Sequence, residues 1–332
     1  MEKRKVQMTG GSSYIITLPK EWIKKMNIEK NDVLEIDTNP DGSLLIVPEG
    51  TGRKGKKALS IDSKDTHNPN FIFRMLVSAY IRGYTSVTIH QSSSIPPEIR
   101  GSIRRFVQNA VGFEIIEEDE KNIEIKDLLD PSEMPPERTI KRMYILVKNM
   151  HDDAISGLID GKKELLKDMN ERDMEIDRLY WLIAHQYNSI SCNKKSAMKM
   201  GVESGAGVYY FIAAKSIERI GDHAVRISDN GMKILESGAS PEILKDLKTA
   251  SGMSIEIFTN SIDSWLRKDM AAANRNIDSV KELAEYCERM AESAIREKGI
   301  VAVALNNIIE SIRRTGEYSA DISEMAINCL IK

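Results

Sequence analysis

The spacing of apolar residues along the chain changes character twice. Over the first 50 residues, short runs rich in β-branched residues are separated by turn signals, which predicts strands joined by tight turns. Residues 58–130 contain both strand-like runs and apolar helical stretches. From residue 137 onward, apolar residues recur every three or four positions, which is typical of helices that bury one face. Two such stripes have seven positions each, from Ala213 to Ile234 and from Leu305 to Ala326. The chain therefore combines a strand-rich start, a mixed middle and a helical remainder.

The predicted elements follow this division. In the first stretch we expect strands near 3–8, 14–18, 33–37 and 43–47, with a short helix at 20–26. In the middle stretch we expect strands near 58–61, 86–90, 114–117 and 122–125, with helices near 70–82 and 97–111. In the last stretch we expect helices near 137–160, 162–192, 204–236, 241–267, 270–298 and 301–331.

Glycine, lysine and proline mark the borders between these stretches. Residues 51–57 are rich in glycine and lysine, and three prolines between 131 and 136 precede the helical part. Pro241 suits the first turn of a helix and divides the helical part in two. We therefore predict a multidomain α+β protein with a strand-rich domain at 1–50, a linker at 51–57, a small α/β domain at 58–130, and tandem three-helix bundles over 135–332, split into 135–238 and 239–332.

A nine-residue segment of the helical part occurs twice, 95 residues apart. The first copy, SIERIGDHA at 216–224, and the second, SIRRTGEYS at 311–319, are identical at four positions. In the first copy, Glu218 and Asp222 are four residues apart at the border of a buried helix face, so both carboxylates lie on one side of the helix. Burying two carboxylates is unfavourable unless a positive charge meets them, and a metal ion or an arginine can supply that charge.

This duplicated segment resembles the E-R-x-x-D repeat of the PhoU family of phosphate-uptake regulators. The resemblance covers about residues 135–332, and it implies two three-helix units in which acidic pairs hold metal clusters. Asp173 and Asp177 lie on the preceding helix, where that family carries a D-x-x-x-D pair. The resemblance therefore implies a site for a divalent metal or iron at Asp173, Asp177, Glu218 and Asp222. The alternative is that these carboxylates are salt-bridged residues at helix edges.

The second copy departs from the acidic pattern. Asp278 and Glu282 correspond to Asp173 and Asp177 of the first repeat. Arg313 stands where the first copy has Glu218, and Glu317 stands where it has Asp222. A guanidinium cannot ligate a metal, but its planar fork bonds a carboxylate well. We therefore expect an ion-pair network rather than a metal cluster in the second repeat. Arg226, one turn beyond Asp222, could also neutralise the first site.

The segments TLPKEW at 17–22 and IEKNDVLEI at 28–36 resemble the AbrB/MazE/SpoVT family of swapped-hairpin DNA-binding domains. This resemblance covers residues 1 to about 50. It implies that two chains interleave their hairpins into one β-barrel and present basic loops to DNA. The DNA contacts it implies are Lys3, Arg4, Lys5, Ser12, Ser13 and Lys20.

These DNA contacts have a weak point and an alternative. Many members of the family carry an arginine in the turn before the second strand, where this chain has Ser12 and Ser13. Serine hydroxyls can bond phosphate but supply no charge. Lys3, Arg4 and Lys5 could instead be solvated charges that guard a strand edge.

Composition and charge bear on the binding partner, the location of the protein and the state of its cysteines. Residues 1–60 hold 11 Lys and Arg against 8 Asp and Glu, a net charge of +3 in a chain whose total is −3. That excess suits an anionic partner such as DNA, although ordinary scatter gives a difference of the same size. No run of about 18 apolar residues occurs, so we expect no membrane insertion and a cytoplasmic location. Cys192, Cys287 and Cys329 are widely spaced, and we expect reduced thiols.

Two functions from different classes fit these observations. The first is a transcriptional regulator of phosphate uptake that binds DNA as a homodimer or a higher oligomer. The second is an adaptor that controls a phosphate transporter ATPase or a sensor kinase by protein contact, with the N-terminal domain serving only to dimerise. Residues 58–130 contain no phosphate loop, glycine fingerprint or catalytic triad. A metal-dependent hydrolase is a third possibility, but no activating base or substrate pocket is visible, and we expect no enzyme.

Overall fold

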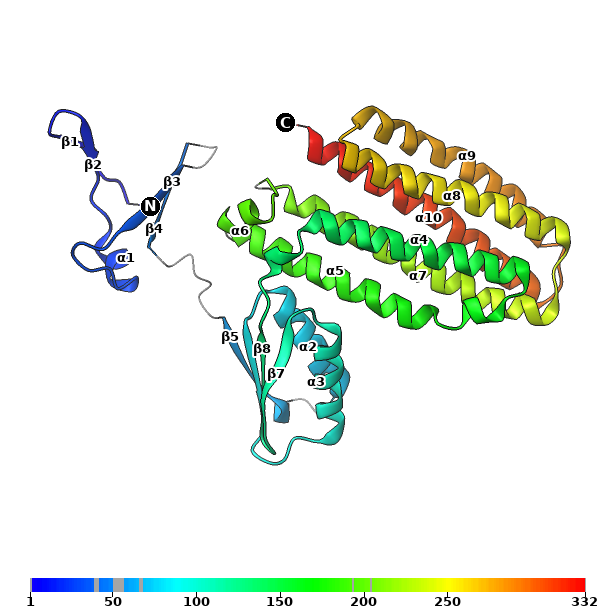
Figure 1. Ribbon diagram of the computed structural model, residues 1–332, viewed down its shortest axis with the longest axis horizontal. Helices are drawn as coiled ribbons and strands as arrows, with labels where there is room; N and C mark the ends of the chain where they lie inside the picture. Colours follow the sequence, from blue (N-terminus) through cyan, green and yellow to red (C-terminus); the bar gives the residue numbers. More distant parts are fainter. Residues whose placement is uncertain are drawn as a thin grey trace. The chain divides into compact units, whose positions relative to one another are not determined.

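The computed structural model describes residues 2–38, 42–49, 57–65, 68–192, 194–203 and 205–331 (Figure 1). The chain separates into two compact units, Met1–Lys56 and Lys57–Lys332. The predicted linker at 51–57 lies outside the described residues except for Lys57. The domain borders given above therefore stay predictions. Among the described residues, no helix combines the length and the apolar character needed to cross a membrane.

The first unit consists of two short hairpins and a helix. Its elements are β1 (Gln7–Thr9), β2 (Ser13–Ile15), α1 (Lys20–Lys25), β3 (Leu34–Thr38) and β4 (Leu44–Pro48). β1 pairs with β2 and β3 with β4, both antiparallel. Gly10 and Gly11 adopt left-handed φ angles of 62° and 78°, which close the turn between β1 and β2. In a single chain the described strands thus form two separate sheets, and the predicted barrel is not closed.

This first unit has no core of its own. None of its described side chains is buried. Apolar residues that a folded domain normally hides are open to solvent, including Met8, which is 65% exposed, and Tyr14, which is 75% exposed. A segment of this size is marginal even when it buries a core, and here the described residues bury no side chain to stabilise it.

The second unit begins with a sheet covered by two helices. Its elements are β5 (Ala58–Asp62), η1 (Ser63–Asp65), α2 (Pro69–Ile81), β6 (Ser86–His90), α3 (Pro97–Asn109), β7 (Phe113–Glu118) and β8 (Asn122–Asp127). In the described chain the strand order is β5-β6-β8-β7, with β5 parallel to β6 and the other neighbours antiparallel. The helices α2 and α3 lie on the same face of the sheet (Figure 1). Tyr80, Phe106 and Phe113 pack edge to face in the core between them.

Helices make up the rest of this unit. They are η2 (Pro131–Glu133), α4 (Pro136–Asp160), η3 (Lys163–Leu166), α5 (Met169–Cys192), α6 (Lys194–Lys199), α7 (Gly207–Ser237), α8 (Pro241–Arg267), α9 (Met270–Ala294) and α10 (Ile300–Leu330). Over the described residues, α4, α5 and α7 contact one another, α8, α9 and α10 do the same, and α7 packs along α10 (Figure 1). We call these the first and the second helical set. The predicted borders of the long helices agree within about four residues, except that the helix predicted from 162 begins at Met169. The separate elements η3 and α6 were not predicted.

The apolar stripes predicted from the sequence are buried. On α7, all seven stripe positions from Ala213 to Ile234 are inaccessible, and on α10 the seven positions from Leu305 to Ala326 are as well. One apolar cluster joins residues of both helical sets. The α/β layer is attached to the first set through α5, where Trp181 packs edge to face on Phe73 of α2 at a ring distance of 5.9 Å. The second unit thus has a continuous interior that holds α5 and α7 in place.

Candidate functional site

The acidic residues predicted on α5 and α7 lie where these two helices pack together. Gly221, the glycine of the repeated segment, makes the approach close. A Cβ added at Gly221 would lie 3.4 Å from Asp173 Oδ1 on α5 and 3.5 Å from Val147 Cγ2 on α4. The α7 backbone is therefore packed directly against the Asp173 carboxylate, which is partly buried and partly shielded from solvent.

Four carboxylates in this region oppose one another's ionisation. Burial raises the pKa of Asp173 to about 7, and the charges of Asp222, Asp177 and Glu218 add to the increase. Burial likewise raises the pKa of Asp177 to about 6, with contributions from Glu218 and Asp222. Burial also raises the pKa of Glu218 and of Asp222, although Lys215 acts against both shifts. The four residues selected from the sequence are thus close enough to repel one another.

Positive charge reaches this acidic group mainly from α7 itself. Lys215 Nζ donates to Glu218 Oε1 at 2.6 Å. Lys215 also lowers the pKa of Asp222 more than Arg226 does, although Arg226 was the cation expected from the sequence. Lys215 was not among the predicted residues, although its spacing of three residues from Glu218 on a helix is the signal that predicts such a pair.

Part of the acidic group has no partner. Asp173 Oδ1 and Glu218 Oε2 are buried, and neither atom accepts a hydrogen bond within the described chain. Buried acceptors are nearly always satisfied, so such atoms call for a cation, a proton or a ligand. Among the described residues, however, no group of three or more His, Cys, Asp or Glu side chains is arranged to hold a metal ion. The acids are gathered, but they do not form a ready coordination shell.

The matching region of the second helical set contains ion pairs. Arg313 pairs with Glu317 and, at 2.8 Å, with Glu310. Arg314 pairs with Glu310 at 2.8 Å and with Glu317 at 3.0 Å. Burial alone would raise the pKa of Glu310, but hydrogen bonds from Arg314 and Arg313 outweigh burial and lower it. The predicted ion-pair network is confirmed, and Glu310 and Arg314 are members that the sequence analysis did not include.

Side chains next to the two acidic positions meet where α7 packs on α10. The rings of His223 and Tyr318 lie 5.8 Å apart, and the guanidinium of Arg219 lies 5.4 Å from the Tyr318 ring centroid. Deeper inside, His151 Nε2 on α4 lies 2.9 Å from Ser251 Oγ on α8. Burial lowers the pKa of His151 to about 4, so this histidine is neutral at neutral pH.

The predicted DNA contacts all lie on the surface of the first unit. Lys3, Arg4, Lys5, Ser12, Ser13 and Lys20 are exposed. Arg4 pairs with Glu2 at 2.6 Å, so part of its charge is already met. Because Gln7 pairs with Ile15 and Thr9 with Ser13, the lysines and the serines lie at opposite ends of the first hairpin. One chain therefore does not gather them into a single patch.

Comparison with known proteins places two families on this chain. Residues 140–230 match the PhoU domain, and residues 7–54 match the family described as antidote-toxin recognition MazE, bacterial antitoxin. The chain is 24% identical over 198 residues to phosphate-specific transport system accessory protein PhoU homolog 1 of Thermotoga maritima, which covers 57% of this chain and 82% of that protein. It is 24% identical over 194 residues to the PhoU homolog of Pseudomonas aeruginosa, covering 55% of this chain and 76% of that protein.

Two solved structures share the helical fold. The crystal structure of PhoU from Pseudomonas aeruginosa aligns with a TM-score of 0.52 at 17% identity, over 58% of this chain and 93% of that one. The phosphate transport system regulatory protein PhoU from Streptococcus pneumoniae aligns with a TM-score of 0.50 at 16% identity, over 59% of this chain and 96% of that one. The helical part of this chain therefore carries a PhoU domain, and its N-terminus carries a MazE/AbrB-like domain.

Proposed function

We propose that this protein is a dimeric DNA-binding regulator of phosphate uptake, whose N-terminal domain contacts the promoter and whose helical domain receives the signal. The observation that carries the proposal is the missing core of the first unit. Residues 2–38 and 42–49 bury no side chain, yet they present apolar residues such as Val6, Tyr14 and Leu44. A second copy that interleaves its hairpins would cover these residues and close the barrel.

Dimerisation would also assemble the DNA contacts. Each chain contributes Lys3, Arg4, Lys5 and Lys20, with Ser12 and Ser13 at the turn. Two copies double the number of cations facing a duplex, and affinity for DNA rises steeply with the number of phosphates neutralised. Pairing of two chains would also bring groups together that lie apart on one hairpin.

The signal is linked to phosphate by the relatives of the helical domain. The Thermotoga maritima and Pseudomonas relatives are named as accessory proteins of phosphate-specific transport systems. Fusing such a domain to a DNA-contacting domain gives a direct route from phosphate supply to transcription. We assign the DNA-binding domain to residues 1–50, and the signal-receiving tandem of three-helix bundles to 135–238 and 239–332.

Footprinting on the promoters of the source organism tests this proposal. We expect protection of discrete sites by the wild-type protein. Changing Lys3, Arg4 and Lys5 together to Ala should weaken binding by roughly tenfold or more at moderate salt, because several phosphate contacts are lost. Lys245→Ala on α8 removes a surface charge outside the proposed interface and serves as the control. Equal, weak binding of all sequences that does not respond to the triple change would rule the proposal out.

We further propose that the acidic group on α5 and α7 accepts a divalent cation or iron, held by Asp173, Asp177, Glu218 and Asp222. The two buried oxygens without partners and the mutual repulsion of the acids support this assignment. Small side-chain movements would be needed to close a coordination shell. Elemental analysis of protein purified without chelator should find metal that is lost in the Asp173→Asn, Asp222→Asn double variant. Protein that stays metal-free after incubation with iron, manganese and zinc would exclude the site.

The alternative function is an adaptor that regulates a phosphate transporter ATPase or a sensor kinase by contact. The serines in the turn where related domains carry arginine favour it, because they leave the DNA surface short of charge. A pull-down with the transporter ATPase separates the two functions. Retention of the ATPase by a variant that has lost DNA binding through the Lys3, Arg4 and Lys5 changes would favour the adaptor.

A further inference from the structure

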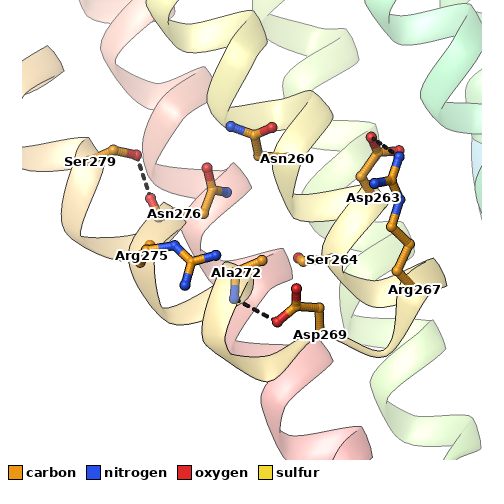
Figure 2. Close-up of a pocket in the computed structure, with 9 residues that line it drawn as sticks. All are labelled: Asn260, Asp263, Ser264, Arg267, Asp269, Ala272, Arg275, Asn276 and Ser279. Carbon is orange, nitrogen blue, oxygen red and sulfur yellow. Dashed lines mark hydrogen bonds and ion pairs between the residues drawn. The ribbon is translucent and has the colours of Figure 1, made fainter.

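A polar pocket opens between α8 and α9 in the second helical set, away from the acidic group of the first set. It encloses about 310 Å³, which is at the lower end of the range for small-molecule sites. Figure 2 shows its lining residues around the turn that joins the two helices. They include Asn260, Asp263, Arg267, Asp269, Arg275 and Asn276.

The arginines of this pocket differ in how far their charge is met. Arg267 pairs with Asp263 at 3.7 Å, both on α8. Arg275 on α9 is exposed and forms no ion pair within the described chain, and its guanidinium extends from α9 beside the pocket (Figure 2). Asp269 accepts from Ala272 N at 2.9 Å, so its charge is partly met by the first turn of α9. The guanidinium of Arg275 is therefore the available anion-binding group.

A buried acceptor in the same pocket points to a second kind of ligand group. Asn276 is only 4% exposed, and its Nδ2 donates to Ile257 O at 2.9 Å and to Ser323 Oγ at 3.0 Å. The carbonyl of Ile257 can only accept, which fixes the orientation of the amide. Asn276 Oδ1 consequently remains an acceptor with no donor within the described chain. This oxygen is covered in the free protein, so a ligand hydroxyl would satisfy it after a small side-chain movement opens it to the pocket.

We propose that this pocket binds a small phosphate ester of a polyol. The phosphate faces Arg275, whose planar fork matches phosphate oxygens, and ligand hydroxyls donate to Asn276 and Asp269. Free inorganic phosphate fits less well, because its few hydroxyls lie on the same group that Arg275 binds and cannot extend to both Asn276 and Asp269. The proposal is independent of DNA binding and of metal at the acidic group.

Calorimetric titration of the full chain with glycerol 3-phosphate tests this site. We expect saturable binding of glycerol 3-phosphate, weaker binding of inorganic phosphate and no heat from glycerol. Arg275→Gln should weaken the binding of glycerol 3-phosphate roughly tenfold or more. Asn260→Ala, at an exposed lining position, should weaken it a few-fold. Arg296→Gln removes the same charge outside the pocket and should leave binding unchanged.

The site is located by hydrogen exchange in the same titration. Protection by glycerol 3-phosphate should concentrate in residues 260–279 and disappear in Arg275→Gln. Since Arg275 is exposed and forms no ion pair in the described chain, its variant should melt like the wild type. The proposal is overturned if sulfate binds as tightly as glycerol 3-phosphate, if Arg275→Gln retains full affinity, or if protection appears elsewhere.

Discussion

The two copies of the repeated segment occupy equivalent helix positions, but the acids near the first copy are largely unpaired and those near the second are neutralised by arginines. In the first set, Gly221 packs against Asp173, and burial and neighbouring acids raise the pKa of that carboxylate to about 7. In the second set, Gly316 packs against Leu283, and the nearby acids are neutralised by Arg313 and Arg314. The two copies therefore share the glycine but not the balance of charges around it. The unmet negative charge of the first copy is an addition that folding does not require, which is why we look for function there.

The largest expected effect comes from the neutral histidine between the helical sets. Burial lowers the pKa of His151 from 6.5 to about 4, so the unfolded state binds the proton more tightly. The stability it contributes is fully present above about pH 6.5 and is lost as the pH falls through about 4, a change of up to about 3 kcal/mol. Urea unfolding near neutral pH and near pH 4 measures this loss.

The control for that measurement is His151→Gln. Carboxylates such as Asp173 have raised pKa values and titrate in the same range with the opposite sign. The difference between the two pH profiles therefore isolates the histidine. The variant should lose less stability on acidification than the wild type, and equal losses would contradict a buried neutral His151.

The two glycines provide the next test. A Cβ at Gly316 would collide with Leu283 Cδ2, in the fully buried core. Gly316→Ala should therefore lower the free energy of unfolding by about 1–3 kcal/mol, after a small offset from improved helix propensity. A Cβ at Gly221 meets its neighbours at ordinary contact distances, 3.4 Å or more. Gly221→Ala should leave the free energy of unfolding unchanged or raise it by up to about 1 kcal/mol. Similar losses of stability in both variants would show instead that the two sites are packed alike.

Removing the central arginine of the second set should have a moderate effect. Arg313→Ala leaves Glu310 and Glu317 with fewer partners in a half-buried place, and we expect a loss of about 1–2 kcal/mol in denaturant unfolding. Lys141→Ala is the matched control, because Lys141 forms an exposed pair with Glu137 at 2.9 Å on α4. That pair should be worth about 0.5 kcal/mol or less. An Arg313→Ala loss no larger than the control would mean that the network is only a surface feature.

The smallest effect has the opposite sign. In chelator-treated protein, Asp173→Asn removes one of the repelling charges and should stabilise the fold by about 1 kcal/mol, allowing for partial exposure. Asp278→Asn changes the corresponding exposed acid of the second set and should have little effect. Thermal melting of the two variants side by side measures the contrast. Destabilisation by Asp173→Asn without metal would mean that the carboxylate has a structural partner.

Much of the fold could be predicted because it depends on local periodicity. The stripe from Ala213 to Ile234 predicted the buried face of α7, and the strand at 86–90 was placed correctly. The turn η3 was missed, because the helix predicted over 162–192 continues through it. Its place is set by tertiary packing: Ser228 Oγ donates to Leu166 O at 2.7 Å, and Gly157 leaves room for the leucine side chain.

The site could be predicted in composition but not in its balance of charges. The spacing of Glu218 and Asp222 predicted that both lie on one side of the helix, and Arg313 predicted the ion pairs of the second set. Which buried oxygens lack partners depends on side-chain directions across helices, which spacing does not encode. The pocket beside Arg275 was missed for the same reason: its lining comes from two helices whose turn fixes the opening.

Because the described residues of the first unit bury no side chain, the folding of this unit should depend on protein concentration. If its apolar residues are covered only by a second copy, these strands fold only when two chains associate. The stability of the folded strands then depends on protein concentration. Dilution would then dismantle the N-terminal unit while the helices of the second unit, with their continuous interior, stay intact. Under the proposed function, the concentration of the protein in the cell would then determine how much of it can bind DNA, independently of any signal received by the helices.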